Sequence, residues 1–404
     1  MHFLPIISSL RRHRTAAALI VLEIALTCAI VCNAVFLVGD RLSTMDQSSG
    51  LVEDELVGVQ WTGIGQPAAN AGGTTAQDLA ALRAIPGVKS TAITNMVPFG
   101  GSSWNNSVST IADDPDPPLN AALWMGSPDL LETFGVKLIA GRDFTPEEYV
   151  DFADVRTQKA SISSVIISRG VAEMMFPGQS AIGKSLYVWS KQPQTVVGVI
   201  EHISRPNEGN GLKYKECAMF VPVNITSGNY VLRVDPARRA EVLKAVDAAL
   251  DKVNPSRIIL ERQTFAEVRE QHFRQDRAMA YLLVGISIAL LIVTALGIVG
   301  LASFWVQQRT RQIGVRRALG ATRNDIVRYF QTENFILASL GIVIGMALAY
   351  AINLVLMSKY QVARLPAEYL PIGAALLWLL GQVAVLGPAL RASLIPPAIA
   401  TRSV

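Results

Sequence analysis

Apolar residues in this chain gather into four long runs that are very unequally spaced. The first run covers residues 15–39, and the others cover 278–306, 334–357 and 369–390. A helix needs about 20 apolar residues to cross the hydrocarbon core of a bilayer, and each run is long enough. A mostly polar stretch, 40–277, follows the first run. The pattern therefore predicts four transmembrane helices, with one large domain outside the membrane inserted after the first.

The first run could also be a cleaved signal peptide, because Arg11, Arg12 and Arg14 precede it. Signal peptides carry an apolar region of about 7–15 residues and a small-residue cleavage site. The run at 15–39 is longer, and no A-x-A site follows it cleanly. We expect a retained anchor, preceded by an amphipathic helix at 1–14.

Two segments of the polar stretch share a strand–helix–strand pattern, which indicates a divergent internal repeat. Pro86-Gly87 and Asn254-Pro255 supply the turns between helix and second strand. The expected elements of the first segment are 56–61, 74–85 and 88–97, and those of the second are 230–234, 236–253 and 257–260. Between them we expect strands at 121–126, 165–168, 185–189 and 194–200, with loops at 67–73 and 113–118. The pattern predicts an α+β domain of two subdomains.

The end of the polar stretch runs into the second apolar run without Gly or Pro. A continuous helix over 264–306 would be about 64 Å long at 1.5 Å per residue. That length is about twice the hydrocarbon thickness. We expect the spare half to project from the membrane as a stalk.

The basic residues predict the orientation. Residues 307–333 between the second and third runs are rich in Arg, whereas the loop at 358–368 has only Lys359 and Arg364. Basic loops stay in the cytoplasm, so we expect both termini, including the tail at 391–404, on that side. The large domain would then be periplasmic, with the chain in a bacterial inner membrane.

Composition supports a membrane protein and excludes several functions. Half of the 404 residues are hydrophobic and 17% are charged, against about 25% charged residues in soluble domains. Cys28 and Cys32 lie within the first span, and Cys217 is alone in the outer domain, so no disulfide framework is expected. The chain has no G-x-x-x-x-G-K-[ST] loop and no G-x-S-x-G elbow, and its four histidines are scattered. We expect no catalytic residue, metal or bound cofactor, and an energy source on another chain.

Two features lie inside the expected spans. Glu23 is an acid within the first span, where charged groups are costly and usually paired or functional. Gly341 and Gly345 form a G-x-x-x-G pattern in the third span, which permits close helix packing either within the chain or to another subunit.

The loop between the second and third spans carries the most specific local pattern. Residues 310–319 predict a short basic helix, and Gly320 is suited to end it in a left-handed turn. Thr322 followed by Asp325 has the capping-box spacing that starts a new helix. Such a helix could lie on anionic lipid through its arginines, or it could dock into a cytoplasmic partner.

The same loop resembles the hallmark segment of FtsX/MacB-type ABC transporter permeases. The residues are RTRQIGVRRALGATRNDIVRYFQTEN, at 309–334, against a pattern of about R-x-x-E-I-G-[IV]-R-[RK]-A-[LI]-G-A-[ST]-[RK]. SPDLLETFGVKLIAGRDFT, at 127–145, is similar to a segment of MacB-like outer domains, as is VIISRGVAEMMFPGQSAIGKSLYV with QTVVGVI. The N-terminal LPIISSLRRHRTAAALIVLEIAL and the C-terminal GPALRASLIPPAIATRSV also resemble family segments.

The resemblance implies an architecture and a role. It implies four spans and an outer α+β domain made of a porter-like and an inserted second subdomain on a helical stalk. It also implies a permease that works in pairs with cytoplasmic ATPase subunits, which hold the ATP and Mg²⁺, and that relays their motion to the outer domain (mechanotransmission). The residues then expected at the ATPase are Ile313, Gly314, Arg316, Arg317, Ala318, Leu319, Gly320, Ala321, Thr322, Arg323 and Asp325.

Two departures from the family bear on the partners. The family's acid is replaced by Gln312, which fits either a homodimer or a pair with a second, non-identical permease. MacB carries its ATPase before the first span, so the ATPase is expected here on a separate polypeptide. The expected role is export or efflux of a peptide, drug or lipid-like substrate, with or without a periplasmic adaptor and outer-membrane channel. The alternative is an FtsX-like regulator or sensor of cell-envelope processes.

Overall fold

The computed structural model describes residues 14–63, 71–189, 192–206, 214–360 and 364–396. It divides into two compact units, which we call the helical unit (1–46 with 275–404) and the outer unit (47–274). The helix expected at 1–14 falls outside the described residues except for Arg14.

The helical unit contains four helices long and apolar enough to cross a membrane within the described part of the chain. Each helix continues past its expected apolar run into polar sequence at one end or both. They are α2 (Arg14–Met45), α9 (Arg274–Gln308), α11 (Arg323–Tyr360) and α12 (Tyr369–Ser393), with the short α10 (Thr310–Ala318) between α9 and α11.

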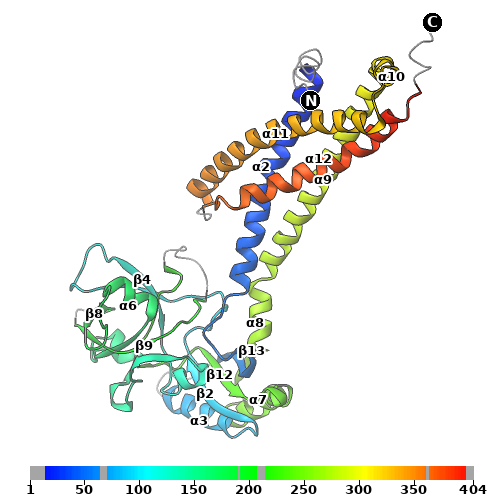
Figure 1. The fold of residues 1–404 in the computed structure, drawn as a ribbon. Helices are drawn as coiled ribbons and strands as arrows, with labels where there is room; N and C mark the ends of the chain where they lie inside the picture. Colours follow the sequence, from blue (N-terminus) through cyan, green and yellow to red (C-terminus); the bar gives the residue numbers. More distant parts are fainter. Residues whose placement is uncertain (1–13, 64–70, 190–191, 207–213, 361–363, 397–404) are drawn as a thin grey trace. The chain divides into compact units, whose positions relative to one another are not determined.

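Helix α11 holds the helical unit together, because it lies against both α2 and α12 (Figure 1). Asn33 of α2 donates a hydrogen bond to the carbonyl of Ala349 in α11 at 3.0 Å. Helix α9 is less buried and contacts α2 through Thr27 and Thr294, whose hydroxyl oxygens are 2.8 Å apart.

The continuous helix expected over 264–306 is wrong. A capping box of Thr264 and Glu267 starts α8 (Phe265–His272), but that helix ends at Phe273, and α9 begins at Arg274. Phe273 has φ −88° and ψ 7°. Its buried ring packs on Phe99 of the outer unit, with the ring centres 5.5 Å apart. This tertiary contact explains why the helix is interrupted at Phe273, although the sequence has no Gly or Pro there.

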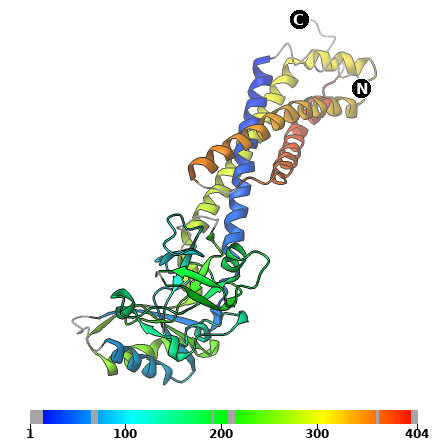
Figure 2. The same cartoon turned by 90° about the vertical axis from the view of Figure 1, so that its left-hand side faces the viewer.

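The outer unit contains a four-stranded antiparallel sheet in the order β13-β1-β12-β2. Two strand–helix–strand segments interlock in it, because each places a strand between the two strands of the other. Their helices pack together on one face of the sheet (Figures 1 and 2). The first segment is β1 (Leu56–Gly63), α3 (Ala71–Arg83) and β2 (Val88–Thr94), and the second is β12 (Asn229–Val234), α7 (Arg239–Val253) and β13 (Arg257–Thr264).

These two segments confirm the strand–helix–strand pattern predicted from the sequence, which occurs twice in one sheet. Several boundaries differ: residues 71–73, expected in a loop, belong to the first turn of α3, and the strands expected at 88–97 and 257–260 end at Thr94 and Thr264. Residues 64–70 lie outside the described residues. The loop expected at 113–118 contains no helix or strand.

A second sheet is inserted between β2 and β12. Its strand order is β5-β9-β7-β10-β4-β3-β8, and β8 also pairs with β9, so six strands close into a ring. We call this part the inserted barrel. Its strands are β3 (Asn105–Ser109), β4 (Leu119–Trp124), β7 (Ser164–Ser168), β8 (Ser185–Val188), β9 (Gln194–Ile200) and β10 (Ala218–Phe220), with β5 (Leu138–Gly141) at the edge.

Short elements complete the outer unit around these two sheets. The helical ones are η1 (Glu53–Glu55), α4 (Leu130–Phe134), η3 (Pro146–Glu148), α5 (Phe152–Arg156), α6 (Arg169–Met175) and η5 (Pro236–Arg238). Two short strands, β6 (Val150–Asp151) and β11 (Val223–Asn224), pair in parallel with each other.

A buried ion pair joins the two repeats of the four-stranded sheet. Asp78 of α3 and Arg257 of β13 have fully buried side chains and share two hydrogen bonds of 2.7 and 2.8 Å. The hydroxyl of Tyr230 donates to the same carboxylate at 2.7 Å. The guanidinium of Arg257 lies 5.3 Å from the ring centre of Trp61. The carboxylate of Asp78 thus accepts three hydrogen bonds, two of them from a cation, which offsets the cost of burying its charge.

Candidate functional site

The loop between α9 and α11 is built around α10 and a glycine turn. Gly320 has φ 100°. Its N–H donates to the carbonyl of Arg317, and the N–H of Ala321 donates to the carbonyl of Arg316, each at 3.1 Å. These two bonds form the Schellman motif, whose left-handed position favours glycine. The short helix and its glycine stop, both expected from the sequence, are confirmed.

The start of α11 has the expected cap. The N–H of Asp325 donates to the hydroxyl of Thr322 at 3.2 Å, and the N–H of Thr322 donates to the Asp325 carboxylate at 2.9 Å. This reciprocal pair satisfies N–H groups that the first turn of a helix leaves without partners. The direction of the chain is therefore fixed on both sides of the glycine turn.

Helix α10 has one buried face and one exposed face. Ile313 and Gly314 are buried, and Ile313 packs with Ile326 and Phe330 of α11. On the other face, Val315 is 45% exposed and Leu319 is 83% exposed. Ala318 lies between them on the same face and is also exposed. Beyond the helix, Thr322, Arg323 and Asp325 are exposed, and Ala321 is half-buried. We call Val315, Ala318 and Leu319 the apolar face of α10.

Two arginines expected at the ATPase are engaged within the chain. The Nη1 group of Arg317 donates to the carbonyls of Ser393, the last residue of α12, and Ile395, just beyond it, at 3.0 and 2.8 Å. Cations favour helix C-termini, where carbonyl groups lack partners. The guanidinium of Arg316 lies 4.7 Å from the ring centre of Tyr329. Arg317 thus links α10 to α12 through hydrogen bonds, and Arg316 links α10 to α11 through its contact with Tyr329.

A third contact between α10 and its neighbours, an ion pair, was not predicted from the sequence. Arg309, at the start of α10, pairs with Glu333 of α11 through bonds of 2.8 and 3.0 Å, and their side chains are only 9% and 1% exposed. Arg309 also lies 5.6 Å from the ring centre of Trp305. The available signal was the position of Glu333, an acid directly before the third apolar run.

The two glycines of the G-x-x-x-G pattern pack against α2 of the same chain. A Cβ atom built on Gly345 would lie 2.5 Å from Cβ of Cys28. One built on Gly341 would lie 2.9 Å from Cβ of Ile24. Both distances are too short for real contacts, so only glycine permits this spacing of α2 and α11. Of the two alternatives left open by the sequence, the structure shows the intrachain one.

Glu23 faces α9. A Cβ atom on Gly297 would lie 2.6 Å from a carboxylate oxygen of Glu23, so the acid rests on the backbone of α9 at a glycine. The side chain is half-buried, and among the described residues Glu23 has no ion-pair partner. Of the two alternatives for this acid, pairing is therefore not made by an ion pair within the described chain, and the functional one stays a prediction.

Comparison with known protein families matches nearly the whole chain. Residues 17–251 match the family described as MacB-like periplasmic core domain, and residues 284–397 match the family described as FtsX-like permease C-terminal. The first match alone covers more than half of the chain, and the second contains α10 and the glycine turn.

Individual relatives are distant. A macrolide export ATP-binding/permease protein MacB from Chromobacterium violaceum is 26% identical over 249 residues, 59% of this chain and 36% of that protein. An uncharacterized ABC transporter permease, YvrN, from Bacillus subtilis is 24% identical over 68% of each chain. The periplasmic region of MacB from Actinobacillus actinomycetemcomitans covers 56% of this chain and 97% of its own, at 12% identity and a TM-score of 0.33. The chain spans about a third of the length of the MacB relatives it matches.

Proposed function

The chain belongs to the MacB/FtsX-like family of ABC transporter permeases, and we propose that the apolar face of α10 is the surface that receives an ABC ATPase subunit. ATP and Mg²⁺ would be held by that subunit, and this chain would contribute no catalytic residue. Movement of the ATPase would enter the permease at α10 and reach the outer unit through α9.

The observation that carries this proposal is an exposed apolar face on a helix that three arginines hold against its neighbouring helices. Leu319 is 83% exposed, while Arg309, Arg316 and Arg317 tie α10 to α11 and α12. A helix that only rested on anionic lipid would turn its arginines outward. Here Arg309 and Arg317 bind groups within the chain, and the exposed Arg316 lies over the ring of Tyr329, while Leu319 is an apolar side chain that is 83% exposed, which favours a protein partner.

The wider assignment follows from the family and from the charge pattern. We propose an inner-membrane location, with both termini and α10 cytoplasmic and the outer unit periplasmic. A second permease, identical or homologous, would complete the transporter, with or without an adaptor and an outer-membrane channel. Relatives named for macrolide and pyoverdine export favour export or efflux as the activity.

The proposal predicts that a charge on the apolar face uncouples the complex. Leu319→Asp should abolish most of the permease-dependent ATP hydrolysis by the co-expressed ATPase and should reduce its co-purification. Gln308→Glu is the matched control, since it adds the same charge at an exposed position at the end of α9, outside the residues expected at the ATPase. If Leu319→Asp retains normal coupling, the docking assignment is wrong. If both variants fail equally, the effect comes from charge on the loop and not from the apolar face.

A further inference from the structure

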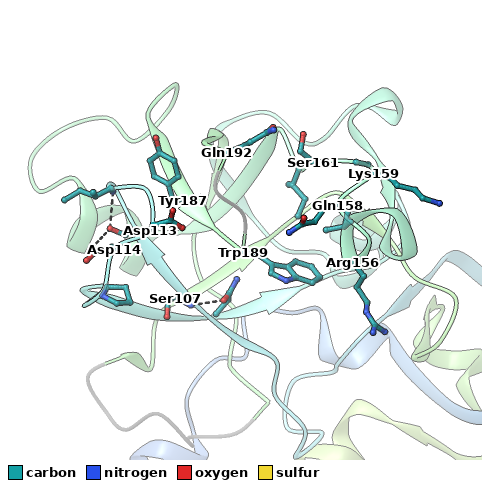
Figure 3. A pocket seen from close by; sticks show the side chains of 17 residues that line it. Ser107, Asp113, Asp114, Arg156, Gln158, Lys159, Ser161, Tyr187, Trp189 and Gln192 are labelled. Carbon is teal, nitrogen blue, oxygen red and sulfur yellow. Dashed lines mark hydrogen bonds between the residues drawn. The ribbon is translucent and has the colours of Figure 1, made fainter.

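The inserted barrel contains an open cavity of about 830 Å³ beside strands β3 and β8. Ligand pockets in proteins occupy about 300–1,000 Å³, so the cavity is large enough for a small organic ligand. The segment after β3 and the segment after α5 form its two sides, and Trp189 lies between them (Figure 3). All of its lining residues belong to the outer unit.

Opposite charges lie at the two ends of this cavity. Asp113 and Asp114 are at one end, and Arg156 and Lys159 are at the other (Figure 3). Asp114 holds its loop in shape by accepting hydrogen bonds from the hydroxyl of Ser109 at 2.5 Å and from the N–H of Asp116 at 3.0 Å. A ligand that satisfied both ends would carry a cation and an anion on one molecule.

The middle of the cavity offers an aromatic surface. Trp189 is 37% exposed, and its ring is held from behind by Phe152, with the ring centres 5.7 Å apart. Phe152 in turn packs on Trp104 at 5.9 Å. An exposed tryptophan that is fixed by its neighbours gives apolar contact area at little entropic cost.

Several polar side chains of the lining are unused. Gln158, Lys159, Ser161 and Tyr187 form no hydrogen bond or ion pair through their side chains in the part of the chain that the structure describes. They supply donors and acceptors on the same surface as the aromatic ring. Such convergent, unsatisfied polar groups around an apolar contact are typical of small-molecule sites.

The backbone is unusual at the same place. Four described residues other than glycine have a left-handed φ, and three of them line this cavity: Asp113 at 50°, Gln158 at 58° and Trp189 at 60°. Left-handed φ is disfavoured for bulky residues such as tryptophan. Unfavourable backbone conformations concentrate at ligand sites, where the position of a side chain matters more than local stability.

We propose that this cavity binds a short zwitterionic peptide. The peptide ammonium would lie at the Asp113 end, its carboxylate would lie at the Arg156 and Lys159 end, and an apolar side chain would cover Trp189. The inference goes beyond the coupling proposal, because binding here requires neither the ATPase nor α10.

The test is calorimetric titration of the full-length chain, in nanodiscs and without ATP, with the tripeptide Ala-Phe-Ala. The free peptide should bind, and N-acetylation or C-amidation should each weaken binding about tenfold, which corresponds to one lost charge-assisted contact. The double variant R156Q/K159Q should weaken the free peptide about tenfold and leave the C-amidated peptide unchanged. Lys184→Gln, exposed on the same barrel but outside the cavity, should bind normally.

A second variant distinguishes loss of the binding contact from loss of folding. Asp113→Gly removes the carboxylate while glycine keeps the left-handed backbone without strain. It should weaken the free peptide and leave the N-acetylated peptide unchanged. The proposal is overturned if no free peptide binds at millimolar concentration, or if these variants bind normally. Equal binding of free and doubly capped peptides would also overturn it and would point to an internal segment of a protein partner.

Discussion

At the residue scale, the buried side chains that matter most are charged. Asp78 and Arg257 in the outer unit, and Arg309 and Glu333 in the helical unit, are each enclosed and paired. Buried charges are tolerated only while the partner is present, because the loss of one leaves the other without solvation. The Asp78–Arg257 pair therefore couples elements that are distant in sequence, and the Arg309–Glu333 pair holds the start of α10 to α11.

Asp78→Asn should destabilise the outer unit by about 3–5 kcal/mol, the usual cost of breaking a buried ion pair. Arg257 would keep its charge, and Tyr230 would lose a charged acceptor. The free energy of unfolding can be measured on the full chain by pulse proteolysis in urea. Asp251→Asn, on the exposed side of α7, is the control and should change little. An equal effect of both substitutions would contradict the role given to the pair.

His202 should make the stability of the outer unit depend on pH. The hydrogen bond to Glu216 raises the pKa of His202 above its ordinary value of 6.5 and lowers the pKa of Glu216 below 4.5. The other ring nitrogen lies 2.9 Å from the carbonyl oxygen of Ser48. The stabilisation from His202 is complete below pH about 6.5 and is lost as the pH rises through its raised pKa. That from Glu216 is complete above about 4.5 and is lost as the pH falls through its lowered pKa.

Proteolysis of the outer unit in the full chain should therefore be slower at pH 6 than at pH 8.5. His202→Gln should remove most of this difference, whereas His272→Gln should preserve it. A difference that persists unchanged in His202→Gln would show that other groups carry the pH dependence.

At the scale of elements, the sequence predicts helices better than it predicts what interrupts them. The apolar runs predicted the four long helices. Gly320 predicted the end of α10, and Thr322 predicted the start of α11. Phe273 ends α8 because its ring packs on Phe99, a residue 174 positions earlier, and no local pattern carries that contact. The three-residue strand β10 is likewise too short to show an alternating pattern.

Close packing of α2 and α11 should depend on their glycine contact. Gly345→Ala should lower the thermal unfolding temperature of the detergent-solubilised chain, because the added Cβ would lie 2.5 Å from Cys28. Gly285→Ala is the matched control, since a Cβ there meets nothing within 4 Å and alanine favours helix. Equal unfolding temperatures of the two variants would contradict the close packing of α2 and α11.

The attachment of α10 should fail when Glu333 loses its charge. Glu333→Gln leaves Arg309 buried without an anion, so we expect a loss of about 3–5 kcal/mol. Thermal unfolding in detergent is the measurement, with Arg323→Gln at an exposed position as the control. Partial recovery in the exchanged pair R309E/E333R would confirm that the interaction is between these two groups. An unaffected Glu333→Gln variant would show that the pair does not stabilise α10.

At the scale of the whole molecule, the architecture was predictable and the use of individual arginines was not. Four spans and an outer domain of two subdomains followed from hydropathy, turn residues and the family resemblance. The sequence grouped Arg316 and Arg317 with Leu319 as equivalent contact residues. The structure separates them by their contacts, because Arg316 lies over the ring of Tyr329 and Arg317 binds the end of α12, whereas Leu319 is 83% exposed. Side-chain direction around this nine-residue helix is set by tertiary packing, which a single sequence does not display.

The most direct test of the central claim is photo-crosslinking from the apolar face of α10 in native membranes. A photoreactive amino acid at position 319 should form an ATP-sensitive crosslink to a cytoplasmic ATPase, and the same amino acid at position 367, in the loop between α11 and α12, should form none. Crosslinking from position 319 to lipid alone would contradict the account and would leave α10 as a helix resting on the membrane surface.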